Sequence, residues 1–196
     1  MTPKLYATPT SRGIRALWYA EETGMDLDYQ PERPHSDVVR KLNPLGTIPV
    51  LEHGDVCLTD STIILSYLAD LHGALTFAQG TSQRQDLDTR LLFLATDLEA
   101  PLWLFYRRTI RGPEDQASDS LKDAMRWDYA RAEASLVKLM DGAPFMMGDD
   151  FTIADIVAGH IGGWGTRAGF TPETAEFGDY VERMQARPAL AAARAR

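Results

Sequence analysis

Residues 43–61 combine two features that together could bind a small acidic peptide. Pro49 stands between two β-branched residues where a strand should begin. A cis Ile48–Pro49 bond would leave the backbone N–H and carbonyl of Ile48 pointing outward, where they can hold another extended backbone. Asp60 and Ser61 then open an apolar helix, whose N-terminus favours anions. The segment therefore predicts a backbone clamp beside a carboxylate pocket.

Strand and helix signals alternate along the first part of the chain, and these elements must position the two features. Strands are expected at 4–7, 27–30, 48–52 and 56–58, and helices at 11–23, 37–42 and 61–72. Gly24 and Gly73 follow two of these helices, as helix-ending residues do. The order βαβαββα predicts a small α/β domain with a mixed sheet flanked by helices.

Beyond residue 80 the strand signals stop and apolar residues recur at helical spacing. Pro101 lies inside a long helical stretch and predicts a kink or a break in it. Thr152 and Asp155 have the spacing of a capping box before a nearly uncharged helix. The helices expected here cover 83–111, 118–140, 154–164 and 177–185. The chain is therefore predicted to consist of the α/β domain at 1–77 and an all-α domain at 84–196.

Composition narrows the classes of protein. The 196 residues carry 20 basic and 28 acidic side chains, a net charge of −8, which argues against a nucleic-acid-binding surface. No apolar run approaches the roughly 20 residues of a membrane span, and no signal peptide is recognised. The single cysteine, Cys57, excludes an internal disulfide and is expected in the core. A single cysteine also fits a reducing compartment, so a cytoplasmic location is expected. The four histidines lack metal-ligand spacing, so we expect no metal site.

Four motifs, in this order, resemble those of the cytosolic glutathione transferase family. They are Asn43-Pro-Leu-Gly-Thr-Ile-Pro-Val-Leu51, Asp60-Ser61 at the start of a helix, Phe151-Thr-Ile-Ala-Asp155, and Tyr180-Val-Glu-Arg183 before Arg187-Pro188. The resemblance covers essentially the whole chain. It implies a thioredoxin-like N-terminal domain, an all-helical C-terminal domain, glutathione as substrate without another cofactor, and a homodimer.

The family's pattern implies roles for four residues that would bind glutathione. Ile48 would bond the cysteinyl backbone, next to a cis Pro49. Ser61, with its backbone N–H, would hold the γ-glutamyl carboxylate. Asp60 would hold the γ-glutamyl ammonium, although the family more often has Glu at this position.

Two less well-defined groups of residues follow from the same resemblance. Arg33 or His35 would meet the glycyl carboxylate, with a solvated loop as the alternative. Trp103, Tyr106 and Arg107 would line a pocket for the second substrate, with core or dimer contacts as the alternative for the tryptophan.

Thiol activation is expected from a hydroxyl between the first strand and the first helix. A hydroxyl that donates a hydrogen bond to the glutathione sulfur favours the nucleophilic thiolate and lowers the pKa of the thiol. Several classes of the family place Ser or Cys where this chain has Thr8, and Ser11 and Thr10 are the second and third candidates. These hydroxyls could instead cap the helix. Tyr6 is the less favoured activator.

These features predict a transferase that joins the glutathione thiolate to small apolar electrophiles, a detoxification reaction. The alternatives are a glutathione-dependent peroxidase, isomerase or dehalogenase on the same site. A non-catalytic glutathione-binding protein of the same fold is the third hypothesis, because threonine at position 8 is an unusual choice.

Overall fold

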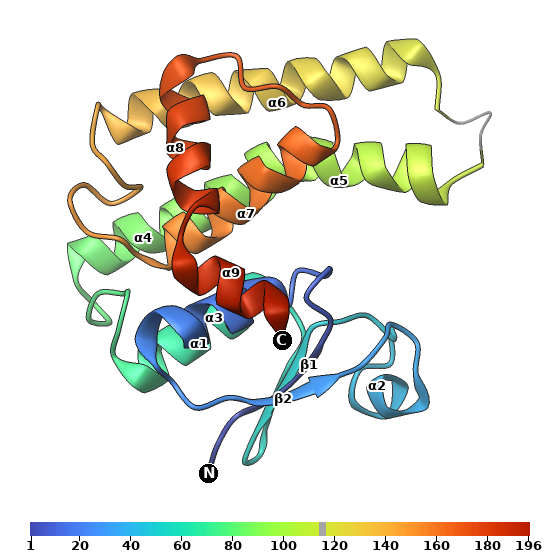
Figure 1. Cartoon of the computed structure of the whole chain (residues 1–196), viewed down its shortest axis with the longest axis vertical. Coiled ribbons are helices and arrows are strands. Elements are labelled where there is room, and N and C mark those ends of the chain that lie inside the picture. Colours follow the sequence, from blue (N-terminus) through green and yellow to red (C-terminus); the bar gives the residue numbers. More distant parts are fainter. Residues whose placement is uncertain (114–116) are drawn as a thin grey trace. The chain divides into compact units, whose positions relative to one another are not determined.

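The computed structural model describes residues 1–113 and 117–196 (Figure 1). These residues form two compact units. The sheet unit comprises Met1–Ala78 together with Ala186–Arg196, and the helical unit comprises Gln79–Gln185. The sequence prediction assigned the last residues of the chain to the helical domain. In the structure their helix packs against the first helix of the sheet unit, so they are grouped with the sheet.

The sheet unit contains a four-stranded mixed sheet. Its strands are β1 (Lys4–Ala7), β2 (Asp28–Pro31), β3 (Val50–His53) and β4 (Val56–Leu58), in the order β2-β1-β3-β4. β1 pairs with β2 in parallel and with β3 antiparallel, which places Leu5 opposite both Tyr29 and Leu51. Leu5 and Leu51 are fully buried. The predicted thioredoxin-like sheet is therefore confirmed.

β4 is an edge strand, and this explains the position of Cys57. The expectation that this thiol is buried is wrong, because Cys57 is exposed. It lies in the middle of a short strand that pairs only with β3 on one side within the sheet. Its Sγ lies 3.7 Å from the carbonyl oxygen of Leu42.

Four helices accompany the sheet. They are α1 (Ile14–Thr23), α2 (Asp37–Leu42), α3 (Ser61–His72) and α9 (Pro188–Ala195). α1 begins three residues later than the sequence predicts, because Ser11, Arg12 and Gly13 form turns in which each carbonyl accepts from the N–H three residues ahead. Gly13 is required in this turn, since an added Cβ would lie 2.3 Å from the Cβ of Ala7. Ser11 thus lies in a loop before the helix.

The helical unit begins with one long helical run that contains two π-helical segments. It comprises α4 (Ser82–Phe93), the π-helical segment η1 (Leu94–Leu98), α5 (Glu99–Tyr106) and the π-helical segment η2 (Arg107–Arg111). In η1 the N–H of Glu99 donates to the carbonyl of Leu94, one residue further back than in an α-helix. The π-helical segment ends three residues before Pro101, the residue at which the sequence predicts a kink or a break.

Three further helices lie in the described part of the helical unit. They are α6 (Asp119–Met140), α7 (Ile153–Arg167) and α8 (Ala175–Gln185). α6 lies alongside α5 (Figure 1). The predicted capping box at the start of α7 is present, and Asp155 is fully buried within it. Its carboxylate accepts hydrogen bonds from the N–H of Met146 and Thr152 and from the hydroxyl of Tyr180.

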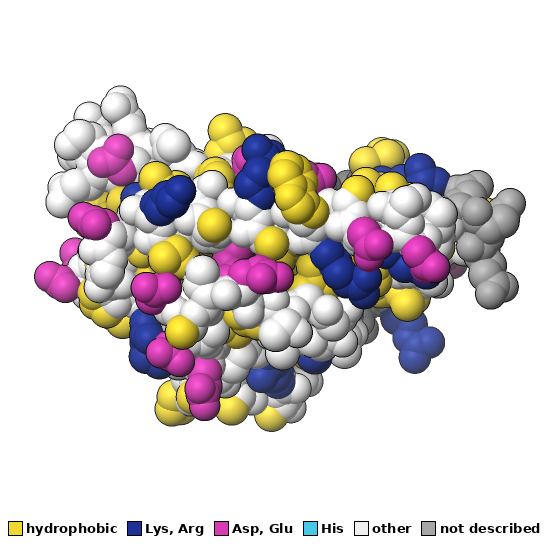
Figure 2. Space-filling view, turned by 90° about the horizontal axis from the view of Figure 1, so that it is seen from above, with side chains coloured by type: hydrophobic (Ala, Val, Ile, Leu, Met, Phe, Trp, Pro, Cys, Tyr) yellow, Lys and Arg dark blue, Asp and Glu magenta, His cyan; other side chains and the backbone are white. Residues whose placement is uncertain are grey.

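Acidic, basic and apolar side chains are interspersed on the face of the molecule seen in Figure 2. Within residues 1–113 and 117–196, no helix combines the length and the apolar character needed to cross a membrane.

Candidate functional site

The loop before β3 contains Ile48 and Pro49, the residues predicted to form a backbone clamp. The Ile48–Pro49 peptide bond is cis, as the sequence predicts. Asn43 is 3% exposed and shapes the loop, because its Nδ2 donates to the carbonyl and the hydroxyl of Thr47, each at 2.9 Å. Pairing of β3 with β1 begins only at Val50. The backbone of Ile48 therefore lies beyond the paired part of β3, where an extended peptide can add to it.

The N-terminus of α3 contains Asp60 and Ser61, the residues predicted to form an anion site. Asp60 is the N-cap residue, and its Oδ1 accepts from the N–H groups of Thr62 and Ile63 at 2.8 and 3.2 Å. Ser61 is the first residue of the helix and is 4% exposed. Its Oγ accepts a hydrogen bond of 3.0 Å from Nη1 of Arg15, on α1.

The sequence reasoning missed Arg15. A signal was present, because a charged residue stands among the apolar residues of the expected first helix. In the structure Arg15 is 1% exposed, and its helical neighbours Leu17 and Trp18 are fully buried. Burying a charge this deeply costs desolvation free energy unless the charged group is hydrogen-bonded. A charged residue on the buried face of a predicted helix therefore indicates a candidate site residue.

The loop between β1 and α1 holds the three candidate hydroxyls, and it uses them differently. The Ser11 hydroxyl donates to the carbonyl of Thr8 at 2.7 Å and accepts from the N–H of Gly13 at 3.1 Å. Its single hydrogen is therefore committed within the loop. The hydroxyl oxygens of Thr8 and Thr10 lie 3.2 Å apart on the exposed side. One of these two hydroxyls donates to the other, which leaves the acceptor's own hydrogen available to a ligand.

This loop lies against the cis-proline loop. A Cβ added to Gly13 would be 3.5 Å from the Cβ of Pro49. The bond from Arg15 to Ser61 links the following turn of α1 to the start of α3. Residues far apart in the sequence, near 8–15, 48–49 and 60–61, are therefore brought together within the sheet unit.

Tyr6 is directed to a different partner. Its hydroxyl donates to Oε2 of Glu52 at 2.6 Å, and its ring packs with Val39 and Val50. Burial, followed by the hydrogen bond and the negative charge of Glu52, raises the pKa of Tyr6 to about 12. A hydroxyl held this way is a poor choice for stabilising a thiolate, which agrees with its lower rank as a candidate.

The two candidates for the glycyl carboxylate, Arg33 and His35, are both exposed. The backbone N–H of His35 donates to the carbonyl of Gly46 at 2.7 Å. The His35 ring covers Gly46 so closely that a Cβ there would lie 2.3 Å from Nδ1. His35 is thus placed against the loop that carries Ile48. Arg33 is an exposed residue in the same segment, two residues earlier and before α2.

In the helical unit, aromatic rings from α5 and α7 form one cluster. Trp103 and Tyr106 are stacked with ring centroids 5.8 Å apart, and Trp164 meets them edge-on at 6.4 and 6.0 Å. The guanidinium of Arg111 lies 5.3 Å from the centre of the Tyr106 ring. Arg107, the cation chosen from the sequence, is exposed at the start of η2. Two of the residues predicted to line the second-substrate pocket, Trp103 and Tyr106, are therefore in contact with each other. Trp164 packs against both rings, and Arg111 lies against the Tyr106 ring.

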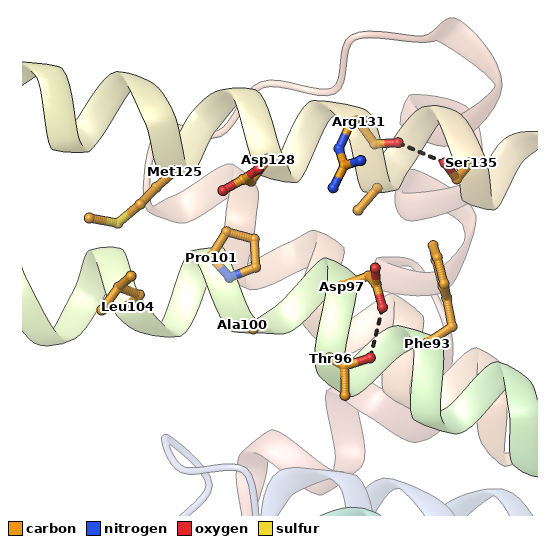
Figure 3. A pocket seen from close by; sticks show the side chains of 11 residues that line it. Phe93, Thr96, Asp97, Ala100, Pro101, Leu104, Met125, Asp128, Arg131 and Ser135 are labelled. Carbon is orange, nitrogen blue, oxygen red and sulfur yellow. Dashed lines mark hydrogen bonds between the residues drawn. The ribbon is translucent and has the colours of Figure 1, made fainter.

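A separate cavity of about 360 Å³ lies between the η1–α5 stretch and α6 (Figure 3). Apolar side chains such as Pro101 and Met125 line it together with Asp97, Asp128 and Arg131. Figure 3 shows Asp97 and Arg131 extending from facing helices. The rings of the aromatic cluster are not part of this lining. The cavity is therefore distinct from the residues predicted to meet a second substrate.

A thioredoxin-like sheet with a cis-proline loop, accompanied by an all-helical unit, defines the class of fold. Residues 1–70 match the family model described as glutathione S-transferase, N-terminal domain. Glutathione S-transferase 1 of Manduca sexta is 28% identical over 165 residues, which cover 78% of this chain and 71% of that protein.

Two solved structures agree over nearly the whole length. A glutathione transferase from Methylococcus capsulatus is 26% identical, with a TM-score of 0.82 and coverage of 99% of this chain and 98% of that one. A sphingomonad glutathione S-transferase complexed with glutathione is 27% identical, with a TM-score of 0.80 and coverage of 98% and 97%. The chain is therefore similar to glutathione transferases over nearly its whole length, and residues 1–70 match the N-terminal domain of that family.

Another relative is much longer than this chain. Elongation factor 1-gamma of Trypanosoma cruzi is 25% identical over 141 residues, which cover 70% of this chain but 32% of that protein. The chain thus spans about a third of the length of that relative.

Proposed function

We propose that this protein is a glutathione transferase that adds the glutathione thiolate to small apolar electrophiles. The observation that carries the proposal is the convergence of three segments in the sheet unit. The loop between β1 and α1 passes beside Pro49 at Gly13, and α1 is bonded through Arg15 to Ser61. A peptide the size of glutathione can contact all three segments at once.

Each end of glutathione has a partner in this arrangement. The cysteinyl backbone pairs with the N–H and carbonyl of Ile48, beside cis Pro49. The γ-glutamyl carboxylate binds Ser61 and the N-terminus of α3, and Asp60 binds the ammonium. His35, whose backbone N–H bonds the loop that precedes Ile48, is the first choice for the glycyl carboxylate, with Arg33 the second.

The Thr8–Thr10 pair activates the thiol. When Thr10 donates to Oγ1 of Thr8, the Thr8 hydroxyl hydrogen is left to donate to the glutathione sulfur. This hydrogen bond favours the thiolate, and the thiol proton leaves to solvent. The thiolate then forms a bond to the electrophilic carbon as the leaving group departs with its electron pair. Ser11 serves the reaction by holding the backbone of this loop.

The aromatic cluster of Trp103, Tyr106 and Trp164 is the proposed contact surface for the electrophile. Stacked and edge-on rings offer a flat apolar surface that suits an aromatic compound. Arg107 and Arg111 add positive charge near the end of this helical run, which favours an electrophile or leaving group that carries negative charge.

A non-catalytic glutathione-binding protein is the second candidate function. Two observations favour it: threonine takes the place of the more usual serine or cysteine, and one relative carries the name of an elongation factor. A glutathione-dependent peroxidase, isomerase or dehalogenase would use the same glutathione-binding residues. We further propose a cytoplasmic homodimer with a role in detoxification.

Two measurements separate these functions. The purified protein is titrated with glutathione, and its rate with glutathione and a chloronitroaromatic compound is compared with a reaction lacking enzyme. Binding with conjugation supports the transferase, whereas binding without conjugation supports one of the other two functions. A panel of peroxide, isomerase and haloalkane substrates then distinguishes an alternative enzyme from a binding protein.

A further inference from the structure

Arg15 is a positive charge enclosed in the sheet unit. It is 1% exposed and ranks among the largest fully buried side chains of the described residues. Arginine stays protonated at any ordinary pH, so this is a permanent charge. The bond from its Nη1 to Oγ of Ser61, at 3.0 Å, places the charge directly behind the first residue of α3.

The chemistry of the two groups fixes the direction of their hydrogen bond. A guanidinium has only donors, so Ser61 must be the acceptor, and the hydrogen of its own hydroxyl has to go elsewhere. A serine inside a helix often donates to the carbonyl four residues earlier. Ser61 is the first residue of its helix, and the residue four positions earlier, Cys57, belongs to β4. The carbonyl that would usually accept the Ser61 hydroxyl hydrogen, that of Cys57, therefore lies outside the helix.

Three positive contributions meet at this point. They are the Arg15 charge, the Ser61 hydroxyl hydrogen and the backbone N–H of Ser61, since the N–H groups of Thr62 and Ile63 already donate to Asp60. A hydroxyl that accepts from a cation becomes a stronger donor, because successive hydrogen bonds polarise one another. The helix N-terminus adds a partial positive charge in the same place. All three would stabilise an anionic group bound beside Ser61.

We propose that Arg15 is a positioning residue for the γ-glutamyl carboxylate of glutathione, which turns the Ser61 hydroxyl hydrogen toward that carboxylate and supplies charge behind it. The inference rests on the proposed function, because it requires glutathione to bind at α3. In this role Arg15 contributes to binding of the carboxylate without contacting it, because it acts through Ser61. Arg15 is expected to affect glutathione affinity, seen in Kd and KM, and to leave kcat nearly unchanged.

Calorimetric titration with three peptides tests this role. Glutathione carries both the carboxylate and the ammonium, glutaryl-Cys-Gly keeps only the carboxylate, and γ-aminobutyryl-Cys-Gly keeps only the ammonium. Arg15→Met is expected to weaken glutathione and glutaryl-Cys-Gly by about ten- to a hundredfold, the range of a charge-assisted hydrogen bond. Its affinity for γ-aminobutyryl-Cys-Gly should match that of the unmodified protein.

Two further variants separate positioning from a general effect on structure. Arg84→Met removes another buried arginine, 5% exposed and paired with Asp88 in the helical unit, and should leave all three affinities unchanged. Arg15→Lys keeps a cation that can donate and should recover part of the loss. In a Ser61→Ala background, Arg15→Met should cost less than it does in the unmodified protein, because the two residues act together.

The possible outcomes distinguish this inference from the proposed function. An equal loss for all three peptides, or an unchanged affinity for glutathione in Arg15→Met, would overturn the positioning role while leaving glutathione binding intact. Failure of the unmodified protein to bind glutathione would overturn both. If Arg15→Met and Arg15→Lys both fail to fold, Arg15 serves the core of the sheet unit and the positioning role is rejected.

Discussion

The Ser11 hydroxyl donates its hydrogen bond to the carbonyl oxygen of Thr8 across 2.7 Å. Two residues that look equivalent as thiol activators therefore have different roles. The hydrogen that Ser11 would need to stabilise a thiolate already bonds the loop, whereas the hydroxyl of Thr8 faces that of Thr10 on the exposed side. Thr8 is thus the proposed activator and Ser11 the residue that shapes its backbone.

Thr8→Val is expected to lower kcat with glutathione and a chloronitroaromatic compound by about a hundredfold, the usual cost of removing one donor to a developing negative charge. Glutathione affinity should change little, because the clamp at Ile48 and the anion site at Ser61 remain. Ultraviolet absorbance of the bound thiolate at neutral pH should fall in parallel. Thr10→Val serves as the comparison, and a large loss there with a normal Thr8→Val would assign the sulfur to Thr10.

Ser11→Ala is expected to lower the free energy of unfolding by about 1–3 kcal/mol, because the loop loses a donor and an acceptor at once. Urea denaturation gives this value. The exposed Ser82, at the start of α4, supplies the control Ser82→Ala, which should stay within about 0.5 kcal/mol of the unmodified protein. A Ser11→Ala variant with normal stability and a hundredfold lower kcat would instead identify Ser11 as the thiol activator.

Gly46→Ala is expected to weaken glutathione binding about tenfold or more, because Gly46 has a φ of +67° and an added Cβ would lie 2.3 Å from Nδ1 of His35. Displacing His35 disturbs the loop that presents Ile48. Gly54, in the β3–β4 turn, has a φ of +60° and open space around it. Gly54→Ala therefore carries the backbone cost of about 1 kcal/mol without the clash. Calorimetry should show normal glutathione affinity for Gly54→Ala, and equal losses in the two variants would refute this account of the loop.

The ion pair between Glu22 and Arg187 predicts a pH dependence of stability in the sheet unit. Burial of Glu22 opposes ionisation, but hydrogen bonds from Arg187 and Trp18 and the charge of Arg187 outweigh it and lower the pKa of Glu22. A lowered pKa in the folded state means that this contribution is present above the usual pKa of glutamate. It is lost as the pH falls through the folded-state pKa.

Glu22→Gln should therefore reduce the free energy of unfolding by about 2 kcal/mol at neutral pH, and the difference should shrink at about pH 3. Urea titrations at both pH values measure it. Glu21→Gln is a suitable control because Glu21 pairs with Arg196 in a more exposed position. A loss in Glu22→Gln that is independent of pH would show that packing, and not charge, explains it.

Much of the fold could be predicted from local signals in the sequence. Alternating strand and helix patterns gave the mixed sheet, and the Thr152–Asp155 spacing gave the capping box that begins α7. Pro49 between β-branched residues gave the cis bond. These features depend on residues close together in the chain, so their physical causes can be read there.

Features that depend on tertiary packing could not be predicted from local signals in the sequence. The helix α1 begins at Ile14 and not at the predicted Ser11, because the Ser11 side chain forms hydrogen bonds within the preceding loop. Cys57 was expected in the core because edge strands cannot be recognised before the strand order is known. The proposed role of Arg15 depends on α1 and α3 being neighbours, although the two bonded residues are 46 positions apart in the sequence.

A calorimetric titration of the protein with glutathione tests the central claim most directly. The account predicts saturable binding of one glutathione per chain, and it predicts that Ser61→Ala weakens this binding about tenfold or more, because the carboxylate loses a donor. The absence of any glutathione binding by the folded protein, or an affinity unaffected by Ser61→Ala, would contradict it.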